Sequence, residues 1–170
     1  SRLETAGNQR RNTRSGGRYL LEWSVGYDQN PGGQFNYRRT NLFVEQVFPI
    51  FDKKRNFAVL MRAAHVDPLH ADGRVPFFLS PTIGGASTLR SYAEERFRAP
   101  TFILFNGEYR WEGFSGLDLA LFFDAGEVGD RLKDISIKDF KSGFGFGLRF
   151  NTNKSVFMRW DMGFGGPEGN

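Results

Sequence analysis

Apolar and polar residues alternate with a period of two along most of the chain, which is the pattern of β-strands with one apolar face. Seven segments show this pattern: 18–28, 40–50, 55–66, 100–112, 116–126, 143–151 and 155–164. Their lengths are close to the roughly 9–11 residues that a tilted strand needs to cross a bilayer. The connections between them alternate between short and long, which is typical of outer-membrane barrels.

The same alternation also fits a soluble β-sandwich, so the choice between the two depends on the character of each face. The polar face of nearly every predicted strand carries charges, which suits a barrel lumen; these residues are Glu22, Glu45, Arg62, Glu108, Arg110, Asp118, Asp124, Arg149, Arg159 and Asp161. The apolar face is rich in aromatic rings toward the strand ends, as in the interfacial girdles of membrane proteins. In 143–150, Gly alternates with larger residues and leaves one face nearly bare, so something could lie against it. These features favour the barrel.

Composition excludes several other classes of protein. The 170 residues are enough for one domain with a substantial core, and the lack of Cys excludes disulfides and thiolate metal sites. The 23 basic and 19 acidic residues are interleaved, unlike the one-sided basic surface of a nucleic-acid-binding protein. No apolar run approaches the ~18 residues of a membrane helix. Residues 1–17 lack a Met and the apolar core of a signal peptide, so we expect that the chain is cut from a longer precursor.

Four short motifs in a fixed order are more specific than the alternation. They are Leu89-Arg90-Ser91-Tyr92 in the long connection, Glu108 in the following strand, Phe122, Asp124 and Gly126 in the next strand, and Gly147 and Arg149 in the one after. In this order they resemble the C-terminal part of the barrel in the BamA-type outer-membrane insertase and transporter superfamily, also called the bacterial surface-antigen domain. The resemblance extends from about Arg18 to Phe164. It departs at Ser91, where the family usually has Gly, and this leaves the conformation of the turn open.

The resemblance implies an all-β fold, a transmembrane antiparallel β-barrel of sixteen strands, of which this chain would supply about seven. Residues 1–17 would be a polar lead-in that could hold part of a preceding strand. Residues 18–164 would form the C-terminal half of the barrel, including the long loop 66–99, and 165–170 would start the last outer loop. The periplasmic POTRA repeats of the family and its closing strand would lie outside this chain.

The function implied by the resemblance is to assist the assembly or translocation of proteins, as an integral protein of the outer membrane. It involves no enzymatic activity, no cofactor and no nucleic acid. The expected partners are the lipid bilayer and client proteins, and periplasmic or lipoprotein partners could act through the POTRA repeats. Three alternatives stay open: the barrel of a family member fused to a lipase-like domain, a passive porin, and a soluble ligand-binding β-sandwich.

The resemblance also implies a lock between the long loop and the lumen wall. In the family, the sixth outer loop folds back into the barrel, where its Arg meets aromatic and acidic residues. The alternation supports this independently, because Phe122 and Asp124 point to the same side, opposite Leu121, and Glu108 falls on the inward face of the preceding strand. Arg90 could therefore find carboxylates and an aromatic ring together, which suits a planar guanidinium.

Two other segments carry weaker predictions. Conceivable metal ligands in an outer loop are His65, Asp67, His70 and Asp72. Their irregular spacing around Pro68 favours an ordinary polar loop, and no nucleophile, phosphate-loop or zinc motif appears in the sequence. The stretch 131–140 could make a short amphipathic helix through Leu132, Ile135 and Phe140.

Overall fold

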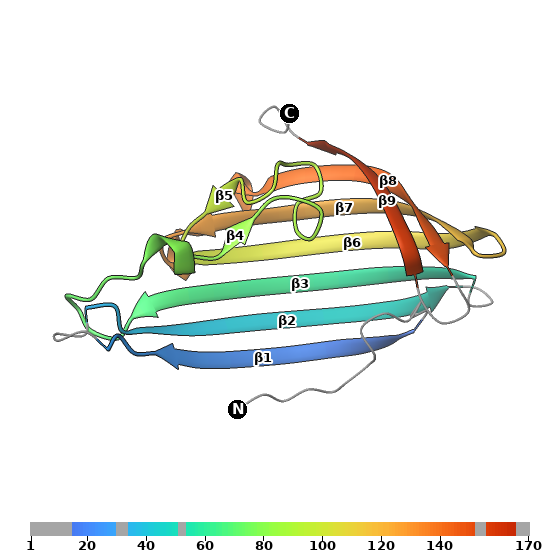
Figure 1. The fold of residues 1–170 in the computed structure, drawn as a ribbon. Helices are drawn as coiled ribbons and strands as arrows, with labels where there is room; N and C mark the ends of the chain where they lie inside the picture. The colour runs from blue at the N-terminus through green and yellow to red at the C-terminus, as the bar shows by residue number, and fades with distance from the viewer. Residues whose placement is uncertain (1–14, 30–33, 51–53, 152–155, 166–170) are drawn as a thin grey trace.

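One antiparallel sheet of seven strands, in the order β1-β2-β3-β6-β7-β8-β9, forms the body of the protein (Figure 1). The structure is a computed structural model, and it describes residues 15–29, 34–50, 54–151 and 156–165. The strands of the sheet are β1 (Gly16–Gly26), β2 (Tyr37–Ile50), β3 (Arg55–Pro68), β6 (Thr101–Phe114), β7 (Leu117–Gly129), β8 (Lys141–Asn151) and β9 (Val156–Gly165). The strands are arranged in the sheet in the order in which they occur in the sequence, as in the wall of an outer-membrane barrel, with β4 and β5 outside the sheet between β3 and β6.

The long connection between β3 and β6 lies on the concave side of this wall. It contains a 3-10 turn, η1 (Phe77–Leu79), and two short strands, β4 (Thr82–Ile83) and β5 (Phe97–Arg98), which pair with each other. In Figure 1, β4 and β5 lie in front of β6 and β7, on the side toward which β8 and β9 curl. The loop and the wall share one apolar cluster, formed by Ala64, Ile83, Leu89, Tyr92, Phe102 and Leu104. The loop is therefore packed onto the lumen side of the sheet.

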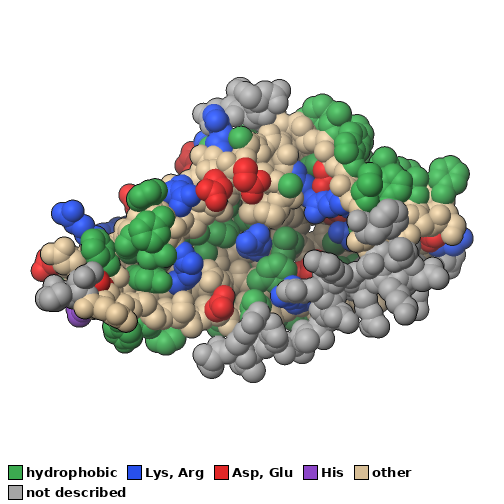
Figure 2. Space-filling model, viewed as in Figure 1, with side chains coloured by type: hydrophobic (Ala, Val, Ile, Leu, Met, Phe, Trp, Pro, Cys, Tyr) green, Lys and Arg blue, Asp and Glu red, His purple; other side chains and the backbone are tan. Residues whose placement is uncertain are grey.

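The two faces of the sheet differ as a membrane barrel requires. On β7, Leu121 and Phe123 are 51% and 49% exposed, whereas Phe122 and Asp124 are 4% and 0% exposed. The large apolar face is thus the open one, the reverse of a sandwich, in which the apolar faces pack together. Figure 2 shows the concave side, where basic and acidic side chains lie across the middle. The predicted all-β membrane-barrel fold is confirmed.

Some details differ from the sequence-based expectations. The strands of the sheet are 10 to 14 residues long, so several continue beyond the predicted segments. The predicted helix in 131–140 is wrong: the segment forms two 3-10 turns, η2 (Leu132–Asp134) and η3 (Ile137–Asp139). On the predicted apolar face, Leu132 is 63% exposed and Ile135 and Phe140 are only partly buried, so little burial would stabilise so short a helix. Residues 1–14 of the predicted lead-in and 166–170 of the predicted outer loop lie outside the described residues.

Within the described ranges, no helix is both long enough and apolar enough to cross a membrane.

Candidate functional site: the loop tip and the lumen wall

A pair of glycines shapes the tip of the long loop. Gly84 and Gly85 have φ values of +123° and +89°, in the region that favours glycine. The Thr88 hydroxyl closes the turn, because it donates to the Gly84 carbonyl oxygen at 2.7 Å and accepts from the Gly84 N–H at 2.8 Å. The N–H of Gly85 also donates to the carbonyl oxygen of Leu89 at 3.1 Å. The following residue, Arg90, is thereby directed at the wall.

Arg90 binds two carboxylates and one aromatic ring. Its Nε donates to Oδ2 of Asp124 at 2.8 Å, its Nη2 donates to Oδ1 at 2.6 Å, and its backbone N–H donates to Oδ2 at 3.1 Å. Its Nη1 donates to Oε2 of Glu108. The guanidinium carbon lies 3.6 Å from the ring centroid of Phe122, which is the geometry of a cation–π contact. The guanidinium thus makes a bidentate contact with Asp124 through its N–H groups and stacks on Phe122 through its face.

The cluster around Arg90 is withdrawn from solvent. The side chains of Arg90, Glu108 and Asp124 are 5%, 8% and 0% exposed. Burial lowers the pKa of Arg90, but the hydrogen bonds and charges of Asp124 and Glu108 outweigh it, so the pKa lies above its ordinary value. Arg90 is therefore charged throughout the physiological range, and its removal would leave the buried Asp124 carboxylate without a cationic partner among the described residues.

Glu108 extends the cluster into a chain of charges across the wall. Both of its carboxylate oxygens accept from Nη2 of Arg149 at 3.0 Å, and it also pairs with Arg110. Arg149 in turn donates to Asp161 on β9 at 2.5 Å, and Asp161 pairs with Arg159. The ion pairs link β6, β8 and β9, so the loop binds a network rather than a single carboxylate.

The bare face of β8 provides the space for this network. A Cβ at Gly145 would lie 2.4 Å from Cζ of Phe122, the ring beneath the guanidinium. A Cβ at Gly147 would lie 2.1 Å from Oδ1 of Asp161 and 2.6 Å from Nη1 of Arg149. Contacts this short do not occur in real structures, so any larger residue at either position would displace a member of the network.

Ser91, the departure from the family motif, fits without an unusual backbone. Its φ is not positive, and its side chain lies against glycines of two strands. A Cβ at Gly143 would lie 2.2 Å from Ser91 Oγ, and one at Gly163 would lie 2.9 Å from it. The hydroxyl therefore occupies space that these two glycines leave open.

Of the other motif residues, Leu89 and Tyr92 belong to the apolar cluster beside Arg90, and Gly126 borders it. Leu89 is 0% exposed, and the Tyr92 hydroxyl donates to the Ser142 carbonyl oxygen on β8 at 3.1 Å. A Cβ at Gly126 would lie 3.2–3.3 Å from side-chain atoms of Leu104 and Ile83, so Gly126 lets the loop approach β7 closely. All ten residues named from the sequence thus lie at the loop tip or on the wall around it.

Three further residues hold the loop tip through its backbone, and the motif comparison missed them. Arg62 of β3, Asn106 of β6 and Arg159 of β9 donate to the carbonyl oxygens of residues 87, 88 and 86, at 3.3, 2.7 and 3.4 Å. Asn106 also donates to Oδ1 of Asp124 at 2.7 Å. The alternation places all three on the inward face, and this was the only sequence signal that could have indicated them. Many other polar residues also face inward, so the signal does not single these three out.

Comparison with known proteins identifies the family. Residues 8–165 match the family model described as the Omp85 superfamily domain. The chain belongs to the Omp85 superfamily. Among solved structures it is similar to BamA from Haemophilus ducreyi lacking POTRA domains 1–3, with a TM-score of 0.70 and 12% sequence identity. The alignment covers 96% of this chain and 40% of that one, so this chain spans less than half of its structural relative. A comparison with curated protein sequences finds no match.

Family and fold together identify this Omp85 chain as part of an outer-membrane β-barrel. The likeness to the BamA structure at this identity shows the fold alone, and the shared fold is that of the barrel wall. The predicted resemblance to the BamA-type superfamily is confirmed.

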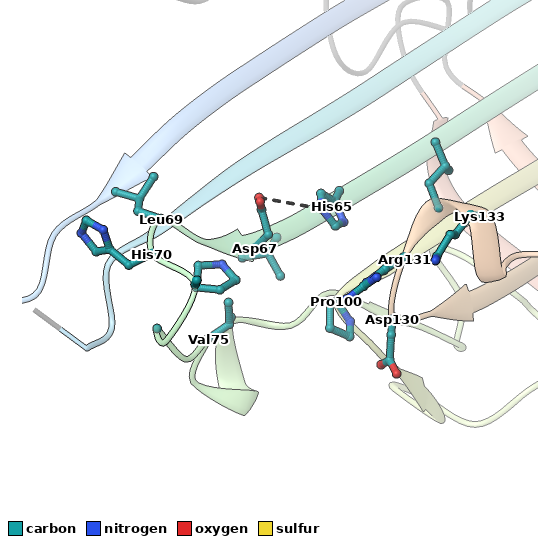
Figure 3. Close-up of a pocket in the computed structure, with 14 residues that line it drawn as sticks. His65, Asp67, Leu69, His70, Val75, Pro100, Asp130, Arg131 and Lys133 are labelled. Carbon is teal, nitrogen blue, oxygen red and sulfur yellow. Dashed lines mark ion pairs between the residues drawn. The ribbon is translucent and has the colours of Figure 1, made fainter.

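The conceivable metal ligands of the outer loop do not form a metal site. Within the described residues, no group of three or more suitable ligands converges. His65 Nε2 lies 3.7 Å from Asp67 Oδ1, while Figure 3 shows His70 well apart from both. Asp67 is bound instead by Arg38, whose Nε and Nη2 donate to its carboxylate at 2.9 and 2.7 Å.

Proposed function

We propose that this Omp85 chain is the C-terminal part of a barrel that assists the assembly or translocation of other proteins at the outer membrane. In this proposal the loop tip locks the lumen wall in register while client strands or chains engage elsewhere. The proposal involves neither a cofactor nor covalent chemistry. Membership of the superfamily supports the role, and the loop contacts support the lock.

The observation that carries the proposal is that one short loop segment binds five strands of the wall. Residues 86–92 accept from or donate to Arg62, Asn106, Asp124, Ser142 and Arg159, which lie on β3, β6, β7, β8 and β9. A slip of one residue between two strands would turn the inward side chains of one of them outward. The loop can therefore make all its contacts only in the native register.

The partners in this proposal follow from the two faces. The open apolar face would contact hydrocarbon, and client proteins would engage the barrel at edges that this loop does not occupy. Periplasmic or lipoprotein partners would act through POTRA repeats in the full-length protein. A lipase-like domain fused ahead of the barrel would be a variation on the same architecture.

The role can be tested with the full-length protein in lipid vesicles and an unfolded outer-membrane barrel as client. We expect the client to reach its protease-resistant folded form faster than in vesicles without the protein. Arg90→Lys should slow this reaction, whereas Lys138→Gln, on an exposed outer turn, should leave it unchanged. If the client folds no faster with the parent protein than in empty vesicles, the assembly role is wrong. Protection of a client chain from external protease inside the vesicles would then test translocation.

A passive porin is separated from this proposal by ion conductance. A porin would show a steady open conductance that Arg90→Lys does not alter. A barrel whose loop lies in the lumen should conduct little, and Arg90→Lys should raise its conductance. This measurement does not depend on the choice of client.

A further inference from the structure

The outer rim of the wall contains a notch that the loop lock does not use. β6 begins at Thr101, whereas β3 continues to Pro68 and the connection after β7 continues past Gly129. The resulting hollow, the outer notch, has a volume of about 870 Å³. It lies between residues 65–75, Pro100 and residues 130–133 (Figure 3).

The floor of the outer notch is fixed by hydrogen bonds. His65 Nδ1 and Thr101 Oγ1 are 2.7 Å apart, and Thr101 Oγ1 donates to the Asp130 carbonyl oxygen at 3.3 Å. The Val66 N–H donates to the Pro100 carbonyl oxygen at 2.9 Å. Thr101 is 2% exposed. Both sides of the notch are therefore tied to its base, and its shape is formed before any ligand arrives.

The notch lies where the outward apolar band of the wall ends. On β3 the outward residues change from Met61 and Ala63 to His65 and Asp67. On β6 the change is from Phe105 and Ile103 to Thr101, in the same rows of the sheet. Long connections mark the outside of an outer-membrane barrel, and the notch lies at the end that carries them. It therefore faces the lipid headgroups of the outer leaflet.

The charges in the notch favour an anion. Arg131 and Lys133 are exposed, and neither side chain forms an ion pair with any described residue. Of the two acidic residues, Asp67 is already bound by the Arg38 guanidinium, and Figure 3 shows the Asp130 carboxylate pointing away from Lys133. Two cations with no ion pair to any described residue thus remain beside the hollow.

Apolar side chains border the same cations. Leu132, between Arg131 and Lys133, is 63% exposed, and Leu69 and Val75 line the same hollow. A free anion in water would gain nothing from these side chains, but the upper part of an acyl chain would cover them. This combination points to a lipid rather than to a soluble phosphate.

We propose that the outer notch binds the phosphate group of an outer-leaflet lipid, with Arg131 and Lys133 as its cationic ligands. This inference rests on the orientation of the barrel and is independent of the Arg90 lock and of the client. A basic residue near a membrane surface contributes about a fivefold gain in affinity for anionic lipid, so two together should contribute about 25-fold.

The test uses the full-length protein in detergent micelles and native mass spectrometry, titrated with phosphatidic acid or with diacylglycerol of the same acyl chains. These probes differ only by the phosphate. We expect phosphatidic acid to bind more tightly, and Arg131→Gln with Lys133→Gln to weaken it about 25-fold. Lys138→Gln, a cation on the same connection that does not line the notch, should have no effect, and Lys133→Arg should retain binding.

Three results would overturn the inference. Diacylglycerol could bind as tightly as phosphatidic acid, or Lys138→Gln could weaken binding as much as the double variant. Inorganic phosphate could also displace the lipid at equal concentration, which would indicate a phosphate site without a lipid. Heat-resistant migration of the double variant on a gel shows that its barrel is folded, so a loss of binding would come from the notch.

Discussion

The lumen wall contains two regions with similar residues and different environments. On β1 and β2, Glu22 is exposed, and its contact is a 3.3 Å hydrogen bond from Asn41. On β7, Asp124 is 0% exposed and accepts from Arg90 and Asn106. Both carboxylates face inward by the same alternation, but the loop covers only the second.

The difference shows what the loop adds to a charged lumen. Attraction between opposite charges is weak in water and much stronger where solvent is excluded. The same exclusion makes an unpaired charge costly. Removal of one partner from a covered pair therefore lowers stability by more than the intact pair contributes to it. The β6–β9 wall is therefore sensitive to substitution, and the β1–β2 wall should tolerate the same changes.

The largest expected effect is at Asp124. In the full-length protein, Asp124→Asn should lower the free energy of unfolding by about 3 kcal/mol, because Arg90 loses a buried charged partner. Glu22→Gln, the matched change on the exposed wall, should stay within about 0.5 kcal/mol. The temperature at which heat-resistant migration is lost, together with the midpoint of urea unfolding, measures both. Equal effects of the two variants would mean that the loop does not distinguish the regions.

A smaller effect is expected when residue 90 keeps its positive charge but the planar guanidinium is replaced by an ammonium. Arg90→Lys should cost about 2 kcal/mol, because an ammonium cannot make the two-pronged contact with Asp124 and lie flat on Phe122. The control is Arg18→Lys, since the Arg18 guanidinium lies 5.0 Å from the Phe43 ring centroid on the β1–β2 wall. That change should cost less than about 1 kcal/mol. If Arg90→Lys is as stable as the parent protein, the lock depends only on the positive charge and not on the geometry of the guanidinium.

Packing beneath the lock should give the next effect. Gly145→Ala should cost about 1–2 kcal/mol, because its methyl group would overlap Phe122 and the Met162 carbonyl oxygen, 2.1 Å away. In Gly107→Ala, the nearest atom to the new methyl group is Cζ of Phe57 at 3.7 Å, an ordinary contact. Urea unfolding of the two variants should therefore differ, and identical midpoints would show that β8 can move away from the ring.

The sequence predicted the architecture of the wall because alternation determines which side chains face the lumen. It also indicated the partners of Arg90, since Phe122 and Asp124 share a side and belong to a family motif. It could not single out Arg62, Asn106 and Arg159, because their selection depends on the register between strands and on where the loop crosses the wall. Those relations join residues 18 to 73 positions apart, and no local pattern encodes them.

The predicted helix in 131–140 failed for a local reason. Asp134 accepts a hydrogen bond from the Arg131 N–H, and Ser136 accepts one from the Lys138 N–H, so side chains stabilise turns in place of a helix. The apolar spacing fitted a helical face, but Leu132 on that face is exposed, and Ile135 and Phe140 are only partly buried. Periodicity predicts a helix only where tertiary packing can use it.

The smallest effects should occur at Ser91, where this chain departs from its family. Gly143→Ala should destabilise the covered wall, because the new Cβ would lie 2.2 Å from Ser91 Oγ and 2.6 Å from its Cβ. In a Ser91→Gly background, the nearest remaining contact is the Phe164 carbonyl oxygen at 3.1 Å, so the cost of Gly143→Ala should shrink. We expect a coupling of about 1 kcal/mol in a double-mutant cycle measured by urea unfolding.

Ser91→Gly alone should change stability little, because removal of a buried hydroxyl with no partner among the described residues offsets the added backbone freedom. Strictly additive effects would mean that the loop tip does not rest on β8 as the structure places it, and the contrast between the two walls would then depend on Asp124 and Glu108 alone.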